Sequence, residues 1–319
     1  MGTVTGQREE INLGKYPSIV VQQIYCDRRL GDVERWLFGC PEDSMVVPDE
    51  IRMCVCFLGY QTQTGEQCYG GTAFFVTRPL ETLKDRSFGY LVTARHVIEK
   101  IKDARADSVL LRLNLKGHGA KAVGVSISEW AYHPTDPTAD IAIMRFNIQQ
   151  DLEHKSIPIG MFATKDVIKQ YGIDVGDELF FPGLFHPHKG EQRNIPIVRI
   201  GNIAAMPAEK VSTKIGNIEA YLVEARSIGG LSGSPVFVNL GGMRHSNLGP
   251  ARFFLLGLMH GHFGSEVSQN SLTETINMGI GIVVPIEVVM ETINHPKFRL
   301  AEDQLEKLER ERELPKMDY

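Results

Sequence analysis

Three short segments carry the residue types that acyl transfer requires. His96 ends an apolar run, Asp140 stands immediately before another, and Ser232 lies among glycines in residues 229–235. A serine hydroxyl is a weak nucleophile, so a histidine must take its proton. An aspartate must hold that imidazole in the correct tautomer and stabilise its cationic form. The three segments together predict a nucleophilic serine site.

The glycines around Ser232 give the backbone the freedom that such a site needs. A sharp turn there can point the N–H groups of Gly230 and Ser232 at the oxygen on which negative charge develops during acyl transfer. Each such donor contributes roughly 3–4 kcal/mol of transition-state stabilisation. We therefore predict that Gly230 and Ser232 form an oxyanion hole.

Asp136 is the alternative to Asp140, because both lie in the same loop. Asp136 directly precedes a proline, and a residue in that position is typical of a turn. Asp140 directly leads an apolar run, so it is the preferred orienting carboxylate. Taken one at a time, each of these residues also has an ordinary structural explanation, and only their combination favours catalysis.

Short strands are the elements that must position these residues. β-branched and aromatic runs alternate with Gly, Pro, Asn and Asp, a pattern typical of sandwiches and barrels. The candidate strands are 51–58, 71–77, 88–93, 108–115, 122–128 and 140–146, followed by 178–182, 195–205, 219–224, 234–238, 253–260 and 276–284. The predicted fold is all-β, with two six-stranded antiparallel β-barrels side by side and short helical extensions at the ends. The predicted site lies between the barrels.

Four segments are expected along the chain. They are an N-terminal extension at 1–50, a first β-barrel with His96 and Asp140 at 51–176, a second β-barrel with Ser232 at 177–290, and a charged helix at 291–319. In the last segment charges of both signs alternate and leucines recur on one helical face. We expect this helix to pack on the barrels or to project from them, the alternative being a helix that binds a partner.

Composition limits the partners and the compartment. The 319 residues include 34 Lys+Arg and 39 Asp+Glu, for a net charge of −5. That balance argues against a nucleic acid or an anionic membrane as the partner. Five cysteines are too few for a disulfide framework, which favours a reducing, cytoplasmic location. The start lacks the features of a signal peptide, and no apolar run reaches the ~20 residues that span a bilayer.

The chemical segments resemble those of a known family. Thr-Ala-Arg-His-Val at 93–97, Asp-Ile-Ala-Ile at 140–143 and Gly-Leu-Ser-Gly-Ser-Pro at 230–235 are similar to three motifs of the trypsin-like (chymotrypsin-fold) serine peptidases. Among these, the bacterial Deg/HtrA-type protease domains are the most similar. Further similarity at 69–76 and 277–285 extends the resemblance over about residues 50–295.

This resemblance implies a peptidase that cleaves protein or peptide substrates through an acyl-enzyme intermediate, without a metal or another cofactor. Ser232 would be the nucleophile, His96 the general base and acid, and Asp140 the orienting carboxylate. Leu231 stands where secreted trypsins carry the aspartate of zymogen activation, so that switch is not expected. Ser234 replaces the usual second glycine of the motif. No peptide-binding PDZ domain is expected after residue 285.

The resemblance also implies a primary specificity pocket formed by residues 225–229 and 257–262. Arg226, His260 and His262 are its candidate substrate-pocket residues, and they would favour an acidic side chain, because a desolvated Arg–carboxylate pair is strong. In the alternative, Arg226 faces solvent and His260 has a structural role. The paired cysteines and histidines of the chain do not complete four ligands at zinc-site spacing, so no metal site is predicted.

The sequence is consistent with two functions. The first is an intracellular serine endopeptidase, whose control by a regulatory protein partner is left open. Its substrate would bind as an extended strand added to a barrel edge. The alternative is a catalytically silent trypsin-like interaction module or scaffold. A third form, related to the first, is a latent enzyme in which a partner orders the turn around Gly230.

Overall fold

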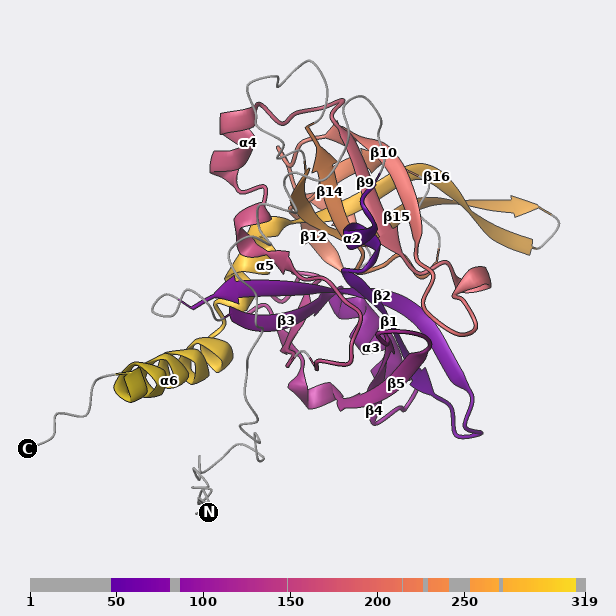
Figure 1. Cartoon of the computed structure of the whole chain (residues 1–319). Coiled ribbons are helices and arrows are strands. Elements are labelled where there is room, and N and C mark those ends of the chain that lie inside the picture. Colours follow the sequence, from indigo (N-terminus) through magenta and orange to yellow (C-terminus); the bar gives the residue numbers. More distant parts are fainter. Residues whose placement is uncertain are drawn as a thin grey trace, which may run out of the picture.

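The computed structural model describes residues 47–80, 87–147, 149–213, 215–225, 229–240, 253–269 and 272–313. Strands dominate these residues and gather into two bodies, which Figure 1 shows one above the other. Strands β1 to β8 form the lower body, here called the first sheet. Strands β9, β10 and β13 to β16 form the upper body, here called the second barrel.

The first half of the chain supplies the first sheet and two helices. The helices are α2 (Asp49–Arg52) and α3 (Arg95–Asp103), and the strands are β1 (Val55–Gln61), β2 (Gln67–Pro79), β3 (Ser87–Thr93), β4 (Ser108–Asn114), β5 (Ala120–Ser126), β6 (Ala131–Tyr132), β7 (Ala142–Arg145) and β8 (Ile157–Pro158). The strand order is β5-β4-β1-β2-β3-β7-β6, and β8 pairs in parallel with β2.

The two ends of the first sheet, β5 and β6, are joined in the chain by residues 127–130 alone. They therefore lie within about 18 Å of each other, and the sheet must curl. The joining residues form a 3₁₀ turn, Ile127–Glu129, and β6 has only two residues, so no extended segment bridges the ends. Among the described strands the sheet stays open. The prediction of a six-stranded antiparallel barrel is not confirmed for this half, which has eight strands and one parallel pair.

The second half of the chain supplies the second barrel and three helices. Its elements are α4 (Lys165–Tyr171), β9 (Glu178–Gly183), β10 (Ile197–Ala205), β11 (Val211–Thr213), β12 (Gly216–Ile218), β13 (Tyr221–Glu224), β14 (Pro235–Asn239), β15 (Phe253–Gln269), β16 (Leu272–Pro285), α5 (Ile286–Ile293) and α6 (Pro296–Glu313). Six of these strands close in the order β10-β13-β16-β15-β14-β9, with every neighbouring pair antiparallel. The prediction of a six-stranded antiparallel barrel is confirmed for this half.

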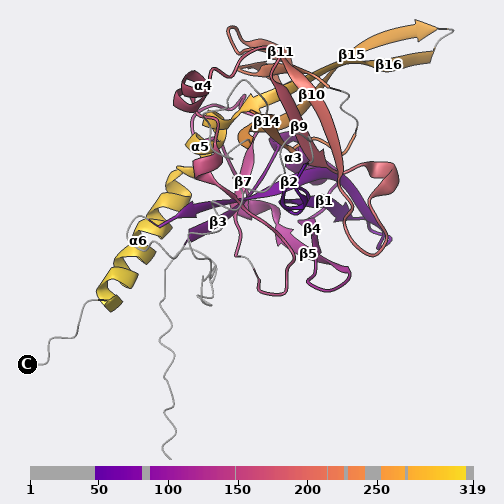
Figure 2. The same ribbon diagram turned by 45° about the horizontal axis from the view of Figure 1, so that its top comes forward.

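Strands β15 and β16 continue beyond the barrel as a two-stranded arm, which Figures 1 and 2 show from two directions. Their pairing runs from Gly257↔Pro285 near the barrel to Gln269↔Leu272 at the far end.

Polar contacts join the two bodies. Arg112 of β4 donates to the backbone oxygens of Lys189 and Glu191, at 3.2 and 2.7 Å, and to the side chain of Asn194 at 3.0 Å. Asn194 returns a hydrogen bond to the backbone oxygen of Arg112 at 2.6 Å. The segment after β9 is therefore fastened to the first sheet. An apolar core continues beneath it, with Phe180 and Leu255 of the barrel in one cluster with the interior of the first sheet.

Helix α6 packs beside β3, as both ribbon views show. Its Glu302 is 1% exposed and pairs with Arg78 of β2, while the Tyr90 hydroxyl of β3 donates to it. Arg145 of β7 lies 3.6 Å from the same carboxylate. A buried charge cluster thus anchors the helix to three strands.

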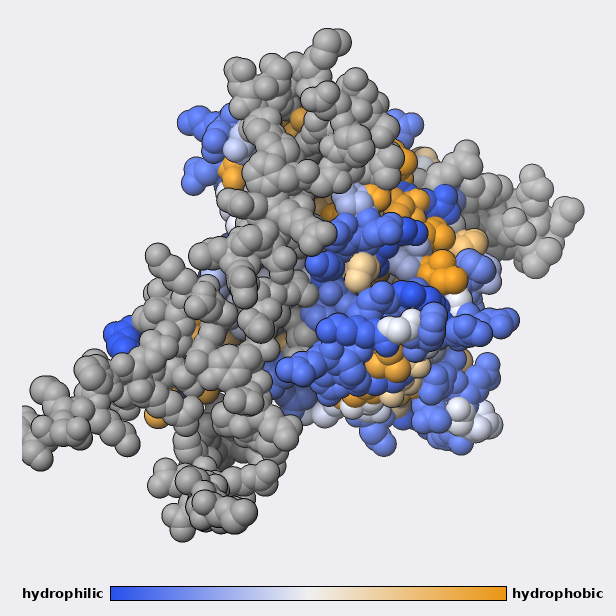
Figure 3. All heavy atoms as spheres, in the orientation of Figure 1, coloured by the Kyte–Doolittle hydropathy of each residue, from blue (hydrophilic) through white to orange (hydrophobic). Residues whose placement is uncertain are grey.

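None of the helices in the described residues is both long enough and apolar enough to cross a bilayer. Hydrophilic side chains cover most of the described part of the face shown in Figure 3, and apolar side chains form small groups there.

Candidate active site

His96 and Asp140 are brought together by the pairing of β3 with β7. Thr93, the last residue of β3, lies opposite Ala142, the first residue of β7. His96 follows Thr93 as the second residue of α3, and Asp140 precedes Ala142, so both side chains emerge at the same end of the strand pair. The contact therefore follows from the register of two neighbouring strands.

Two hydrogen bonds join His96 to Asp140. The backbone N–H of His96 donates to Oδ1 at 2.9 Å, and its ring Nδ1 lies 2.7 Å from Oδ2. The first N–H groups of a helix have no partner within the helix, and the residue that caps α3, Ala94, offers no side-chain acceptor. Asp140 supplies that acceptor from another part of the chain. It fixes the start of α3 and the orientation of the imidazole together.

Asp140 is fully buried and ionised. Burial raises the pKa of its carboxyl, but hydrogen bonds from His260 and His96 outweigh burial, and the pKa lies well below its usual range. An ionised carboxylate only accepts hydrogen bonds, so the facing Nδ1 atoms of both histidines carry their protons. In neutral His96 the lone pair is then on Nε2, the nitrogen that acts as the base in a Ser-His-Asp site.

Asp136, the alternative carboxylate, is held within its own turn. Its Oδ1 accepts from the backbone N–H of Thr138 at 2.8 Å and from the Thr138 hydroxyl at 2.6 Å. Asp140, not Asp136, contacts His96.

The turn that carries Ser232 depends on two glycines. Gly230 has φ +101° and Gly233 has φ +83°, both in the region that favours glycine. A Cβ atom on Gly233 would overlap the backbone oxygen of Thr72. The glycine-rich sequence is therefore required by a close approach between the two bodies.

Thr72 of β2 holds this turn from the first sheet. Its N–H donates to the Ser232 backbone oxygen at 3.0 Å, and its hydroxyl donates to the Gly230 oxygen at 2.7 Å. The same hydroxyl accepts from the N–H of Leu184 at 2.9 Å, and Thr93 bonds the Thr72 backbone oxygen at 2.7 Å. Thr72 is fully buried, and its role in holding the turn was not predicted, although it lies in the segment 69–76.

The backbone N–H groups of Gly230 and Ser232 have no acceptor among the described residues. They are the two donors that the sequence predicted for an oxyanion hole. Donors held by the fold without a partner of their own can bind a developing negative charge.

In this structure the Ser232 hydroxyl does not engage His96. It donates to the backbone oxygen of His260 at 3.2 Å, and within the described residues no hydrogen bond joins Ser232 to His96. His96 and Asp140 are hydrogen-bonded to each other, while the serine hydroxyl is turned toward β15. Bonds of this kind are often long or misaligned without substrate and tighten in the substrate complex.

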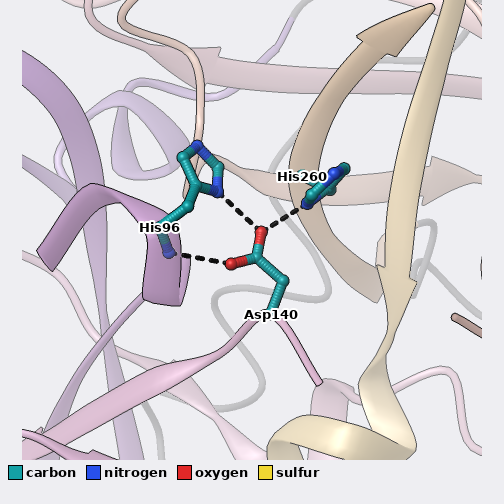
Figure 4. Close-up of side chains that lie close together, drawn as sticks. All are labelled: His96, Asp140 and His260. Atoms are coloured by element: carbon teal, nitrogen blue, oxygen red, sulfur yellow. Dashed lines mark hydrogen bonds and ion pairs between the residues drawn. The ribbon is translucent and has the colours of Figure 1, made fainter. Parts of the chain in front are cut away.

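His260 is a second imidazole on Asp140. Its Nδ1 forms a hydrogen bond with Oδ2, the oxygen that His96 also contacts, and Figure 4 shows the two rings on either side of the carboxylate. The ring centroids are 5.4 Å apart with a T-shaped arrangement. His260 was predicted to line a substrate pocket. Its link to Asp140 was not predicted, because that link depends on a strand irregularity that has no sequence motif.

The rest of the predicted substrate pocket is only partly visible. Arg226 lies outside the described residues. His262 is exposed on β15, and desolvation of its ring lowers its pKa. The roles of Arg226, His260 and His262 toward substrate stay predictions.

His96, Asp140 and His260 also have the donor atoms of a metal site, and these atoms lie within 4.8 Å of one another. Around a tetrahedral zinc ion, with bonds of 2.0–2.1 Å, neighbouring donors lie about 3.3 Å apart. The His96 Nδ1 to Asp140 Oδ2 distance of 2.7 Å is instead that of a hydrogen bond. The arrangement suits shared protons better than an ion. Cys54 and Cys56 are buried, and burial raises the pKa of both thiols, which disfavours a nucleophilic or ligating thiolate.

Two solved structures are similar to this chain. One is the apo MamO protease domain from Magnetospirillum magneticum, with 13% sequence identity, a TM-score of 0.45, and coverage of 76% of this chain and 96% of that one. The other is an inactive Ser-to-Ala mutant of Rv3671c from M. tuberculosis, with 14% identity, a TM-score of 0.40, and coverage of 80% and 94%. The sequence matches no protein-family model and no curated relative.

Proposed function

We propose that this protein is a serine endopeptidase, with Ser232 as nucleophile, His96 as general base and acid, and Asp140 as the orienting carboxylate. The observation that carries the proposal is the pair of hydrogen bonds from His96 to the buried Asp140. They leave Nε2 of His96 as the basic nitrogen. The glycine turn that presents Ser232 beside this pair supports the same assignment.

In the proposed reaction, Ser232 Oγ attacks the scissile carbonyl carbon while His96 Nε2 takes its proton. The N–H groups of Gly230 and Ser232 stabilise the resulting oxyanion. The imidazolium then protonates the leaving amine, the C–N bond breaks, and an acyl-enzyme remains. Water, deprotonated by His96, hydrolyses that ester and regenerates the Ser232 hydroxyl.

The edge of β15 supports binding of an extended peptide. Strand β14 pairs with β15 from Phe253 to Leu258 and goes no further. From His260 onward, β15 has β16 on one side and no described strand on the other. A substrate strand can add to such an edge, where backbone hydrogen bonds give affinity and side-chain pockets give specificity. That edge begins at the residue whose carbonyl contacts Ser232.

The alternative is a silent trypsin-like scaffold, and the orientation of the Ser232 hydroxyl toward His260 favours it. A latent enzyme, in which substrate or a regulatory protein partner releases the hydroxyl, is consistent with the same geometry. A cytoplasmic location remains part of the proposal, based on the low cysteine content.

Fluorophosphonate labelling tests the proposal. The wild type is expected to be labelled and Ser232→Ala is not. Ser234→Ala is the matched control, because the Ser234 hydroxyl is buried two residues away without a hydrogen-bond partner in the described structure, and its removal should leave labelling intact. A folded wild type that stays unlabelled, with and without added peptide, would favour the scaffold.

A further inference from the structure

His260 contacts two parts of the candidate site at once. Its imidazole Nδ1 meets Asp140 Oδ2, and its backbone oxygen accepts from the Ser232 hydroxyl. Its side chain is 13% exposed, that of His96 is 16% exposed, and that of Asp140 is buried. Among the described residues, no other forms hydrogen bonds with both Ser232 and Asp140.

A β-bulge in β15 explains this double contact. Met259 lies opposite Val283 and Gly261 lies opposite Ile282, so His260 is the extra residue between two adjacent rungs of the ladder with β16. A bulged residue is released from regular pairing, and bulges next to active sites re-aim side chains. Here the bulge turns the imidazole toward Asp140, as Figure 4 shows, and frees the carbonyl for Ser232.

We propose that His260 is a positioning residue whose neutral imidazole holds the Asp140 carboxylate in place. Protonation of His260 then stops the reaction, because the resulting cation competes with the His96 imidazolium for the same carboxylate. This inference rests on the proposed serine peptidase function. It goes further by giving the site a second imidazole that must stay neutral while His96 accepts a proton.

The charges of the site explain why His260 must stay neutral during the reaction. With both rings neutral, the unit of His96, Asp140 and His260 carries one negative charge, which the His96 imidazolium formed during acylation neutralises. If His260 is already cationic, the same step creates a net positive charge among groups that are largely out of water. A second cation whose ring centroid is 5.4 Å away then opposes the proton transfer that the reaction needs.

The groups that face His260 are few. Among the described residues, its side-chain contacts with titratable groups are Asp140, just ahead of β7, and His96 at the start of α3. Ser232 meets its carbonyl from the turn before β14. His262 follows two residues along the same strand. Among the described residues, Asp140 thus supplies the single negative charge that is hydrogen-bonded to both rings.

Two substitutions separate positioning from simple packing. His260→Asn keeps a donor, since the Asn amide nitrogen can take the place of Nδ1, but removes the ionisable ring. His260→Ala removes the donor as well. We expect His260→Ala to lower kcat roughly 10- to 100-fold with little change in KM, and His260→Asn to recover most of that loss. His118→Asn, an exposed histidine in the β4–β5 turn, is the matched control.

The pH dependence of kcat/KM is the measurement that would not change if His260 served only to pack the site. The acid limb of kcat/KM is expected to report two ionisations in the wild type and in His118→Asn, and one ionisation in His260→Asn. The proposal is overturned if His260→Ala keeps wild-type kcat. It is equally overturned if both His260 variants are folded and impaired alike, with the acid limb unchanged.

A measurement without turnover separates this inference from the proposed function. Proton NMR of the histidine ring N–H groups should show two downfield signals from protons bonded to Asp140, with one lost in His260→Asn and both lost in Asp140→Ala. If the wild type resists fluorophosphonate but shows both signals, the proposed function fails while His260 still shares Asp140. A single signal in the wild type overturns the inference whatever the activity.

Discussion

Asp140 is the residue on which the site depends, because it accepts three N–H donors from two histidines. Such a carboxylate fixes which ring nitrogen carries a proton, and its replacement by an amide alters that choice while preserving shape. Predictions at this scale therefore concern tautomers and charges.

Asp140→Asn is expected to lower kcat by roughly 10⁴, because the amide can donate to Nδ1 and so leave the wrong nitrogen of His96 protonated. Steady-state hydrolysis of a peptide substrate measures the loss. Asp136→Asn is the control, since Asp136 contacts only its own turn in the described structure. A crippled Asp136→Asn beside an active Asp140→Asn would reverse the assignment.

Asp140 is also expected to make stability depend on pH. Because its folded-state pKa lies below its unfolded value of about 4, the ionised form stabilises the fold above pH ~4, and that contribution is lost as the pH falls below ~4. Urea unfolding of the wild type and Asp140→Asn should show a free-energy difference at pH 6 that shrinks toward pH 3. An equal difference at both pH values would contradict this expectation.

At the scale of elements, strand β2 organises the nucleophile turn of the other body. Thr72 binds both sides of that turn through its N–H and its hydroxyl, and it also takes the N–H of Leu184 after β9. The geometry of the candidate oxyanion hole is thus set by a strand of the first sheet.

Thr72→Val keeps the shape and removes the hydroxyl, leaving the N–H of Leu184 and the oxygen of Gly230 without that partner. We expect a loss of about 1–3 kcal/mol in the free energy of unfolding and a fall in kcat larger than the change in KM. Urea unfolding and peptide hydrolysis measure the two effects. Thr72→Ser should restore both stability and kcat. A valine variant with unchanged kcat would show that the Thr72 hydroxyl does not position the site.

At the scale of the whole molecule, sequence patterns predicted part of the fold and part of the candidate site. The motifs around His96, Asp140 and Ser232 identified residues that the fold places in one region. The strand pattern correctly predicted the second barrel. The open first sheet escaped prediction because closure depends on whether 127–130 forms a strand or a turn, a choice made by packing. The role of His260 escaped because a one-residue bulge leaves no periodic signal.

Helix α6 contributes to the stability of the whole molecule through Glu302. Glu302→Gln removes the buried carboxylate charge that pairs with Arg78, which is 8% exposed, and we expect a loss of about 3–5 kcal/mol in the free energy of unfolding. Chemical denaturation measures it. Asp303→Asn, with its side chain 64% exposed, should change stability by about 0.5 kcal/mol or less. Equal effects of the two variants would show that the buried cluster does not anchor the helix.

The division of the site between two bodies has a consequence for the order of events during synthesis. A ribosome completes the first sheet, with His96 and Asp140, before residue 232 is made, and domains fold from the N-terminus as they emerge. The emerging half carries the proposed base and carboxylate but not the proposed nucleophile. The Ser232 turn, once made, accepts hydrogen bonds from Thr72 of the first sheet. On the proposed assignment, an unfinished chain that lacks Ser232 cannot form an acyl-enzyme.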